Sequence, residues 1–141
     1  MHFPAAHTDT DLVVHFVGSN VFHLGDLFNA GKASFPNVDI EAGGTLGGLE
    51  EALAELLDII PPGAKIIPGH YDLADAASLR KTYKMVVDTV GQVREAKAAG
   101  LDLAEIQEKG LADLYRDWGK TGYTSAEDWI ANIFMALEAG Q

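Results

Sequence analysis

The sequence predicts an α+β domain in which helices cover one face of a small sheet. Short apolar runs rich in β-branched residues indicate about three strands, and longer stretches with helical periodicity indicate about four helices. Three strands are few for the helices that they must support. We therefore expect the sheet to be completed by a missing part or by another copy of the chain.

A hairpin is predicted near the N-terminus. Residues 11–17 are apolar and largely β-branched, and the turn Gly18-Ser19-Asn20 separates them from the apolar run 21–24. This pattern predicts two largely buried antiparallel strands. Residues 64–67 predict a third strand, which leads directly into a turn at Pro68-Gly69-His70.

Each predicted helix begins at a residue that can cap its first turn. Apolar residues recur at spacings of three and four along these segments, as on an amphipathic helix. The glycine-rich stretch 29–48 lacks a period and predicts a long loop over a site. The predicted helices follow Thr45, ending before Pro61; Asp75, over about 76–99; Asp102, ending near Lys109; and Thr124 or Ser125.

The charge balance argues against nucleic acid as a partner. The chain has 141 residues, 21 acidic and 10 basic, which give a net charge of −11. Such a charge repels phosphate backbones unless a basic patch overrides it. The densest basic cluster, Arg80, Lys81 and Lys84, lies on one predicted helix. A solvated helix face is the simpler explanation of that cluster.

Composition also limits the membrane and metal chemistry. No apolar run approaches the roughly 20 residues that span a bilayer, and the N-terminus lacks the features of a signal peptide. We therefore expect a soluble, cytoplasmic protein that forms one domain over residues 1–141. The chain has no cysteine, so a metal site must use histidine nitrogen and carboxylate oxygen.

Three residues are candidate metal ligands: His7, Asp26 and His70. Each lies beside a tight turn at the end of an apolar stretch, and strand ends of one sheet lie close together. Each residue alone has an ordinary explanation, as a hydrogen-bonded histidine or a turn cap. Together they favour a shared site, for which zinc, iron and manganese are all suitable.

Asp11 is a candidate supporting residue. Its carboxylate could accept a hydrogen bond from His7 and orient the imidazole from outside the metal's own ligands. Capping the start of the strand is an equally good explanation of Asp11. The sequence leaves these two roles open.

Residues 3–100 resemble the C-terminal half of a metallo-β-lactamase-fold hydrolase. The resemblance rests on Ala6-His7-Thr8-Asp9-Thr10-Asp11, Gly25-Asp26-Leu27-Phe28 and Pro68-Gly69-His70, in this order. It implies one half of an αββα sandwich, followed by a helical extension over 101–141. Thr10 and Tyr71 stand where glycine is common in the family, and either change could narrow the approach to a metal.

The resemblance also implies roles for the three candidate ligands. His7 resembles the third histidine of the first metal site, Asp26 the carboxylate that bridges two metals, and His70 a ligand of the second metal. The family's His-x-His-x-Asp-His motif is absent, and no His-x-His pair occurs in the sequence. The family site is therefore expected to be incomplete, with at most three ligands from one chain.

Two functions follow from the resemblance. The first is a zinc-dependent hydrolase that acts on a small ester, thioester or lactam substrate. The alternative is a catalytically inactive fold remnant or an oligomerising interaction module. In both cases the exposed sheet face is expected to pack against a second copy, which gives a homodimer or a higher oligomer.

Overall fold

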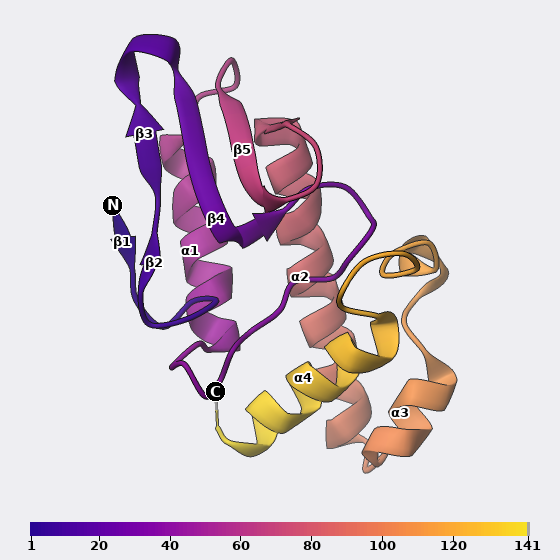
Figure 1. The fold of residues 1–141 in the computed structure, drawn as a ribbon. Coiled ribbons are helices and arrows are strands. Elements are labelled where there is room, and N and C mark those ends of the chain that lie inside the picture. The colour runs from indigo at the N-terminus through magenta and orange to yellow at the C-terminus, as the bar shows by residue number, and fades with distance from the viewer. Residues whose placement is uncertain (141) are drawn as a thin grey trace.

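The computed structural model describes residues 1–140 of the 141-residue chain. Strands and helices form separate layers, and the C-terminal helices lie beyond one end of the sheet (Figure 1). The strands are β1 (His2–Phe3), β2 (Asp11–Leu12), β3 (Val14–Phe16), β4 (Val21–Asn29), β5 (Lys65–His70) and β6 (Ala74–Asp75). The α-helices are α1 (Leu46–Ile59), α2 (Ala76–Ala98), α3 (Leu103–Lys109) and α4 (Ala126–Glu138).

The main sheet has the strand order β3-β4-β5-β6. β3 and β4 are antiparallel, β4 and β5 are parallel, and β6 returns antiparallel to β5. Helix α1 makes the crossover between the two parallel strands, because parallel neighbours cannot be joined by a tight turn. β1 and β2 form a separate two-stranded sheet.

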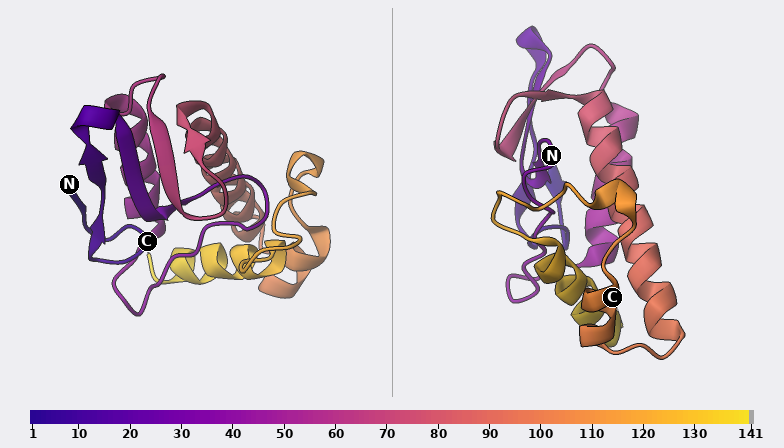
Figure 2. Two further views of the ribbon diagram at one scale, coloured as in Figure 1. Left: turned by 45° about the horizontal axis from the view of Figure 1, so that its top comes forward. Right: turned by 90° about the vertical axis from the view of Figure 1, so that its right-hand side faces the viewer.

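Helices α1 and α2 cover one face of the main sheet, as the sequence predicts (Figure 2). Phe22 and Leu24 of β4 and Ile66 of β5 are buried against these helices. Their helix partners are also fully buried: Leu49, Leu53, Leu56, Leu79, Val86 and Val90. Alternation along the strands therefore places one side of the sheet in the core.

Helix starts follow the sequence prediction closely. Thr45, Asp75, Asp102 and Ser125 each accept a hydrogen bond from a backbone N–H in the first turn that follows. These bonds satisfy donors that have no partner inside the helix. No helix within residues 1–140 is sufficiently long and apolar to cross a bilayer.

The prediction that both hairpin strands are largely buried is wrong for β3. Val14 and Phe16 are 48% and 49% exposed, and they lie on the sheet face that α1 and α2 do not cover. His15 between them stacks on the buried ring of Phe22, with centroids 3.9 Å apart. Val14 and Phe16 therefore form an exposed apolar strip on the outer face of the sheet.

The strand ends also differ from the prediction. β4 continues through Gly25 and Asp26 to Asn29, and β5 includes Pro68-Gly69-His70, where a turn was expected. Pairing between the two strands prolongs both of them, so tertiary contacts override the local turn preference of Pro-Gly. Asp26 therefore lies inside a strand and not at its end.

Candidate metal centre

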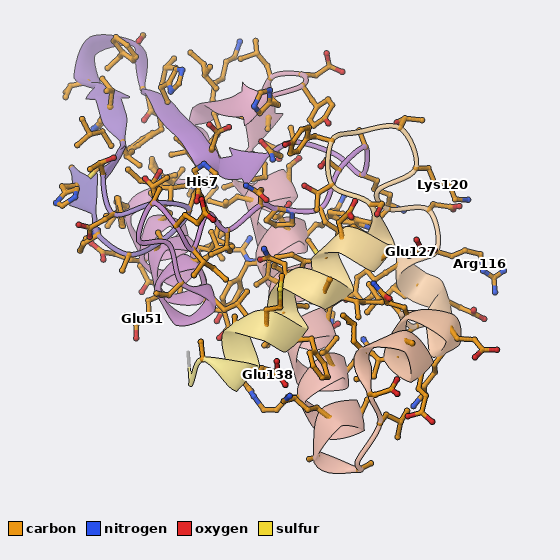
Figure 3. The ribbon with its side chains drawn as sticks, turned by 60° about the horizontal axis from the view of Figure 1, so that its bottom comes forward. His7, Glu51, Arg116, Lys120, Glu127 and Glu138 are labelled. Atoms are coloured by element: carbon orange, nitrogen blue, oxygen red, sulfur yellow. The ribbon has the colours of Figure 1, made fainter. Side chains whose placement is uncertain are left out.

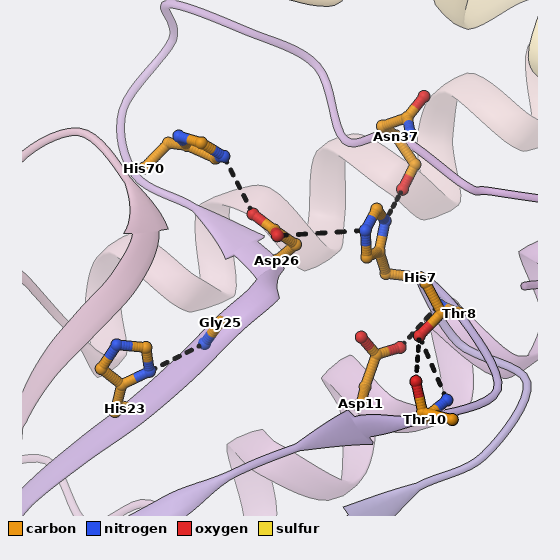
Figure 4. A network of polar contacts seen from close by, with 9 residues as sticks. All are labelled: His7, Thr8, Thr10, Asp11, His23, Gly25, Asp26, Asn37 and His70. Carbon is orange, nitrogen blue, oxygen red and sulfur yellow. Dashed lines mark hydrogen bonds and ion pairs between the residues drawn. The ribbon is translucent and has the colours of Figure 1, made fainter. Parts of the chain in front are cut away.

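The three predicted ligands come together at one place on the sheet (Figure 4). His7 lies in the loop after β1, Asp26 in β4, and His70 at the end of β5. The Asp26 carboxylate lies between the two imidazoles. Its Oδ2 is 4.0 Å from Nε2 of His7, and its Oδ1 is 3.1 Å from Nε2 of His70.

The tautomer of His7 follows from its hydrogen bond to the backbone. Nδ1 lies 2.8 Å from the carbonyl oxygen of Asn37, which can only accept. The proton of neutral His7 is therefore on Nδ1, and Nε2 carries a lone pair directed towards Asp26. A carbonyl that fixes the ring in this way is a common support for metal-binding histidines.

His7 and Asp26 thus bring two acceptors together without a donor between them. In neutral His7 the Nε2 lone pair faces Oδ2 of Asp26, and an ionised carboxylate also only accepts. A metal cation that both groups bind would satisfy these two acceptors. This arrangement is chemically suited to a metal ligand set.

Asp26 Oδ1 provides a second indication. This oxygen is buried and receives no hydrogen bond, although Nε2 of His70 lies 3.1 Å away. The two atoms are close enough to attract each other as an ion pair, but they do not form a hydrogen bond. Buried carboxylate oxygens without a donor are costly, so this atom is available to a cation.

Local backbone geometry brings Asp26 to His70. Between Gly25 and Asn29, β4 advances four residues while β5 advances two, from Pro68 to His70, so β4 bulges here. Gly25 has a φ of 55°, in the left-handed region that favours glycine. A Cβ on Gly69 would lie 2.3 Å from Oδ1 of Asp26, so only glycine permits this approach.

The loop that carries His7 is held by the first turn of α1. A Cβ on Gly44 would lie 2.2 Å from the carbonyl oxygen of His7, and one on Gly48 would lie 1.9 Å from that of Ala5. The Thr45 hydroxyl donates to the Ala5 carbonyl at 2.8 Å. The glycines near the start of α1 therefore allow the backbone of the His7 loop to pack directly on the helix.

Asp11 acts on the loop and does not bond to the His7 imidazole. Its Oδ2 accepts a hydrogen bond from the backbone N–H of Thr8 at 2.7 Å. The carbonyl of Asn37 has the position beside His7 Nδ1 that one of the two roles considered for Asp11 required. Asp11 thus fixes the turn that follows His7.

The three candidate ligands line one cavity of about 260 Å³. Sequence reasoning missed much of its wall, because the residues carry no metal-binding chemistry and lie far apart in the chain. The Ser34 hydroxyl accepts a hydrogen bond from the Thr124 N–H at 2.9 Å, which ties the C-terminal segment to the loop after β4. The other lining residues are Asn29, Ser34, Asn37, Tyr71, Tyr123 and Thr124.

Tyr71 lines the cavity directly after His70. Its φ of 74° lies in the left-handed region that favours glycine, so the backbone at Tyr71 is strained for a bulky side chain. A Cβ on Gly122 would lie 2.3 Å from the Tyr71 hydroxyl, so the ring reaches the C-terminal segment. Tyr71 therefore forms the part of the cavity wall next to His70.

The three side chains converge without forming a closed ligand set. Neighbouring ligands of a tetrahedral zinc ion lie about 3.3 Å apart, given metal–ligand bonds near 2.0 to 2.1 Å. The His70–Asp26 pair at 3.1 Å is compatible with this spacing, and the His7–Asp26 pair at 4.0 Å is wider. Within residues 1–140 no group of three or more His, Cys, Asp or Glu side chains is already placed to hold a metal ion.

Solved structures identify the architecture. A metallo-β-lactamase from Pontibacter korlensis is 20% identical over 62% of this chain, with a TM-score of 0.53. One from Hirschia baltica is 23% identical over 59%, with a TM-score of 0.50. The chain has part of the metallo-β-lactamase fold. No protein-family model and no curated protein sequence matches it.

The match to the metallo-β-lactamase fold is partial in both directions. The DIM-1 metallo-β-lactamase aligns with 61% of this chain and with 39% of its own length, at 17% identity and a TM-score of 0.52. For the Pontibacter and Hirschia enzymes the matched share of their own length is 40% and 37%. The chain thus spans about two fifths of these metallo-β-lactamases.

Proposed function

We propose that this metallo-β-lactamase-fold chain binds a divalent metal, zinc in the first instance, through His7, Asp26 and His70. The observation that carries the proposal is the position of the Asp26 carboxylate between two imidazoles, with one oxygen towards each ring. The buried, unbonded Oδ1 supports it. Iron and manganese suit the same donor atoms.

We further propose that the metal serves hydrolysis of a small ester, thioester or lactam. When bound, zinc supplies a Lewis acid that polarises a carbonyl group and lowers the pKa of water. The Asn37 carbonyl keeps the His7 proton on Nδ1 and its Nε2 free. Tyr71 and Tyr123 lie at the same cavity, where their rings can hold a substrate's apolar part against the centre.

Zinc should raise the melting temperature of the protein. Binding to the folded state alone adds about 2.7 kcal/mol at a zinc concentration one hundred times the Kd, a shift of roughly 5 to 10 °C. We expect this shift relative to EDTA, measured by differential scanning fluorimetry. It should be lost in His7→Ala and in His70→Ala.

A matched control separates ligand loss from general destabilisation. His15→Ala removes an exposed histidine of β3, stacked on Phe22 and outside the cavity, so its zinc shift should equal that of the wild type. Equal melting temperatures of the wild type in zinc and in EDTA would contradict the metal proposal. The alternative, a catalytically inactive remnant of the fold, would then be favoured. A zinc shift without turnover of ester, thioester or lactam substrates would sink only the hydrolase proposal.

The uncovered face of the sheet is proposed to pack on a second copy of the chain. Val14 and Phe16 of β3 lie on that face and, with the neighbouring Leu12 and Val17, are 48% to 78% exposed. An apolar band of this kind is characteristic of an interface. A two-fold axis would place the same band of both copies in contact.

Native mass spectrometry tests the oligomer. We expect a dimer at micromolar concentration, and Phe16→Glu should convert it to a monomer because a carboxylate would be buried without a partner. Tyr123→Glu adds the same charge at an exposed aromatic residue of the segment before α4, which is not part of the band of Leu12, Val14, Phe16 and Val17, and should leave the dimer intact. A monomeric wild type at this concentration would contradict the proposal.

A further inference from the structure

A second cavity, of about 340 Å³, lies between the loop after β4, helix α2 and the segment that precedes α4. It shares no lining residue with the metal centre. We call it the lysine cavity and define it by Lys32, Lys81, Lys84, Leu114, Tyr115 and Trp118. It combines three cationic groups with a large apolar surface.

The apolar part of the lysine cavity is rigid. Tyr115 and Trp118 are 5% and 7% exposed, and their rings meet edge to face at 6.3 Å. The Tyr115 hydroxyl donates to the carboxylate of Asp88 on α2. Both aromatic rings are thus held in place beside the cavity and lose no side-chain entropy when a ligand binds. Leu114, which is exposed, supplies most of the open apolar surface.

One backbone hydrogen bond and the geometry of α2 place the three lysines around the aromatic rings. The backbone N–H of Gly119 donates to the carbonyl of Lys32 at 2.9 Å, which brings Lys32 beside Trp118. Lys81 and Lys84 are three residues apart on α2 and share one face of the helix. Three of the ten basic residues of a chain with net charge −11 therefore surround one cavity.

The acidic groups near the lysine cavity are already engaged. Lys84 donates to Asp88 at 2.7 Å, and this bond, with that from Tyr115, lowers the pKa of Asp88. Asp117 pairs with Lys120 at 2.7 Å, and Asp113 pairs with Arg116. Lys120 and Arg116 project from the outer edge of the C-terminal segment (Figure 3).

Two of the cavity's cations remain without a close counter-ion. Over residues 1–140, no carboxylate oxygen lies within 4.0 Å of Nζ of Lys32 or Lys81. Lys32 and Lys81 influence Asp117 and Asp75 only from a longer distance. An isolated pair of ammonium groups beside buried aromatic rings is complementary to an anion with an apolar body.

We propose that the lysine cavity binds a small organic anion: its apolar group packs on Leu114 and on the accessible edges of Tyr115 and Trp118, and Lys32 and Lys81 hold its carboxylate or phosphoryl group. The volume is at the lower end of the range for small-molecule sites. Ligand recognition here does not depend on the metal. The loop after β4 then contributes to two binding sites, through Asn37 at the metal centre and through Lys32 at the lysine cavity.

Isothermal titration with 1-naphthoate and 1-naphthylphosphonate tests this site. Both titrations are made in EDTA, so that a metal at His7, Asp26 and His70 cannot contribute. We expect binding of at least one anion, no heat from the neutral analogue 1-naphthalenemethanol, and weaker binding at high salt. The tighter of the two anions identifies the preferred head group.

Substitution of the two unpaired lysines gives the decisive comparison. The double variant Lys32→Gln/Lys81→Gln should raise the Kd at least tenfold, while Lys65→Gln, an exposed lysine of β5, should leave it unchanged. In NMR spectra the indole N–H signal of Trp118 should shift with ligand. Absence of binding at millimolar ligand, or equal binding by the double variant or the neutral analogue, would overturn the proposal.

Discussion

Gly48→Ala is expected to destabilise the fold by about 2 to 3 kcal/mol, at the upper end of the cost of overpacking. The new Cβ would lie 1.9 Å from the carbonyl oxygen of Ala5 and 2.6 Å from its carbon. Neither backbone can yield without breaking the Thr45–Ala5 hydrogen bonds that hold the His7 loop. The variant should therefore lose both stability in urea unfolding and the zinc-dependent rise in melting temperature.

Gly47→Ala is the matched control for this prediction. Gly47 is the preceding residue of α1, and a Cβ there would meet nothing within 4 Å. Alanine should stabilise the helix by up to about 1 kcal/mol, because it has less backbone freedom to lose. If Gly48→Ala proves as mild as Gly47→Ala, the close packing of the His7 loop on α1 is incorrect.

Trp129→Ala is expected to cost about 3 to 5 kcal/mol, the range for removing a large buried aromatic side chain. Trp129 is fully buried on α4, stacks on Phe35 at 6.2 Å and donates its indole N–H to Thr89 of α2 at 2.9 Å. Phe35 lies in the loop after β4, next to Ser34 of the metal cavity. Equilibrium unfolding in urea measures the loss.

Trp129→Phe separates the packing of this side chain from its hydrogen bond. Phenylalanine keeps an aromatic ring beside Phe35 and removes only the indole N–H and part of the volume. The Thr89 hydroxyl still donates to the Met85 carbonyl at 2.8 Å, so no buried donor is orphaned. We expect a cost of about 1 to 2 kcal/mol. Equal costs for the alanine and phenylalanine variants would contradict the role assigned to ring packing.

Much of the fold follows from local sequence. Thr45, Asp75 and Asp102 predict helix starts because a side-chain oxygen next to the first turn satisfies a free N–H wherever the helix packs. Periodicity likewise predicts that α1 and α2 share one face of the sheet, since burial of an apolar stripe needs only a partner surface.

Strand limits and burial could not be obtained in the same way. Pro68-Gly69 has the composition of a turn, yet pairing with β4 draws it into β5. β3 has the composition of a buried strand, but the exposure of Val14 and Phe16 depends on what lies opposite the sheet. The extent of β5 and the burial of β3 both depend on segments that are distant in the chain. Local propensity carries no information about those segments.

By itself, the sequence determined the α+β class, the capped helices and the three residues that converge, because each depends on side-chain chemistry or on periodicity within one segment. Only the tertiary structure decided how they meet. In the folded chain Asp26 lies inside a bulged strand, and the Asn37 carbonyl is the hydrogen-bond partner of His7. The segment with Thr124 lies at the cavity. These are backbone approaches between distant segments, and no residue type predicts them.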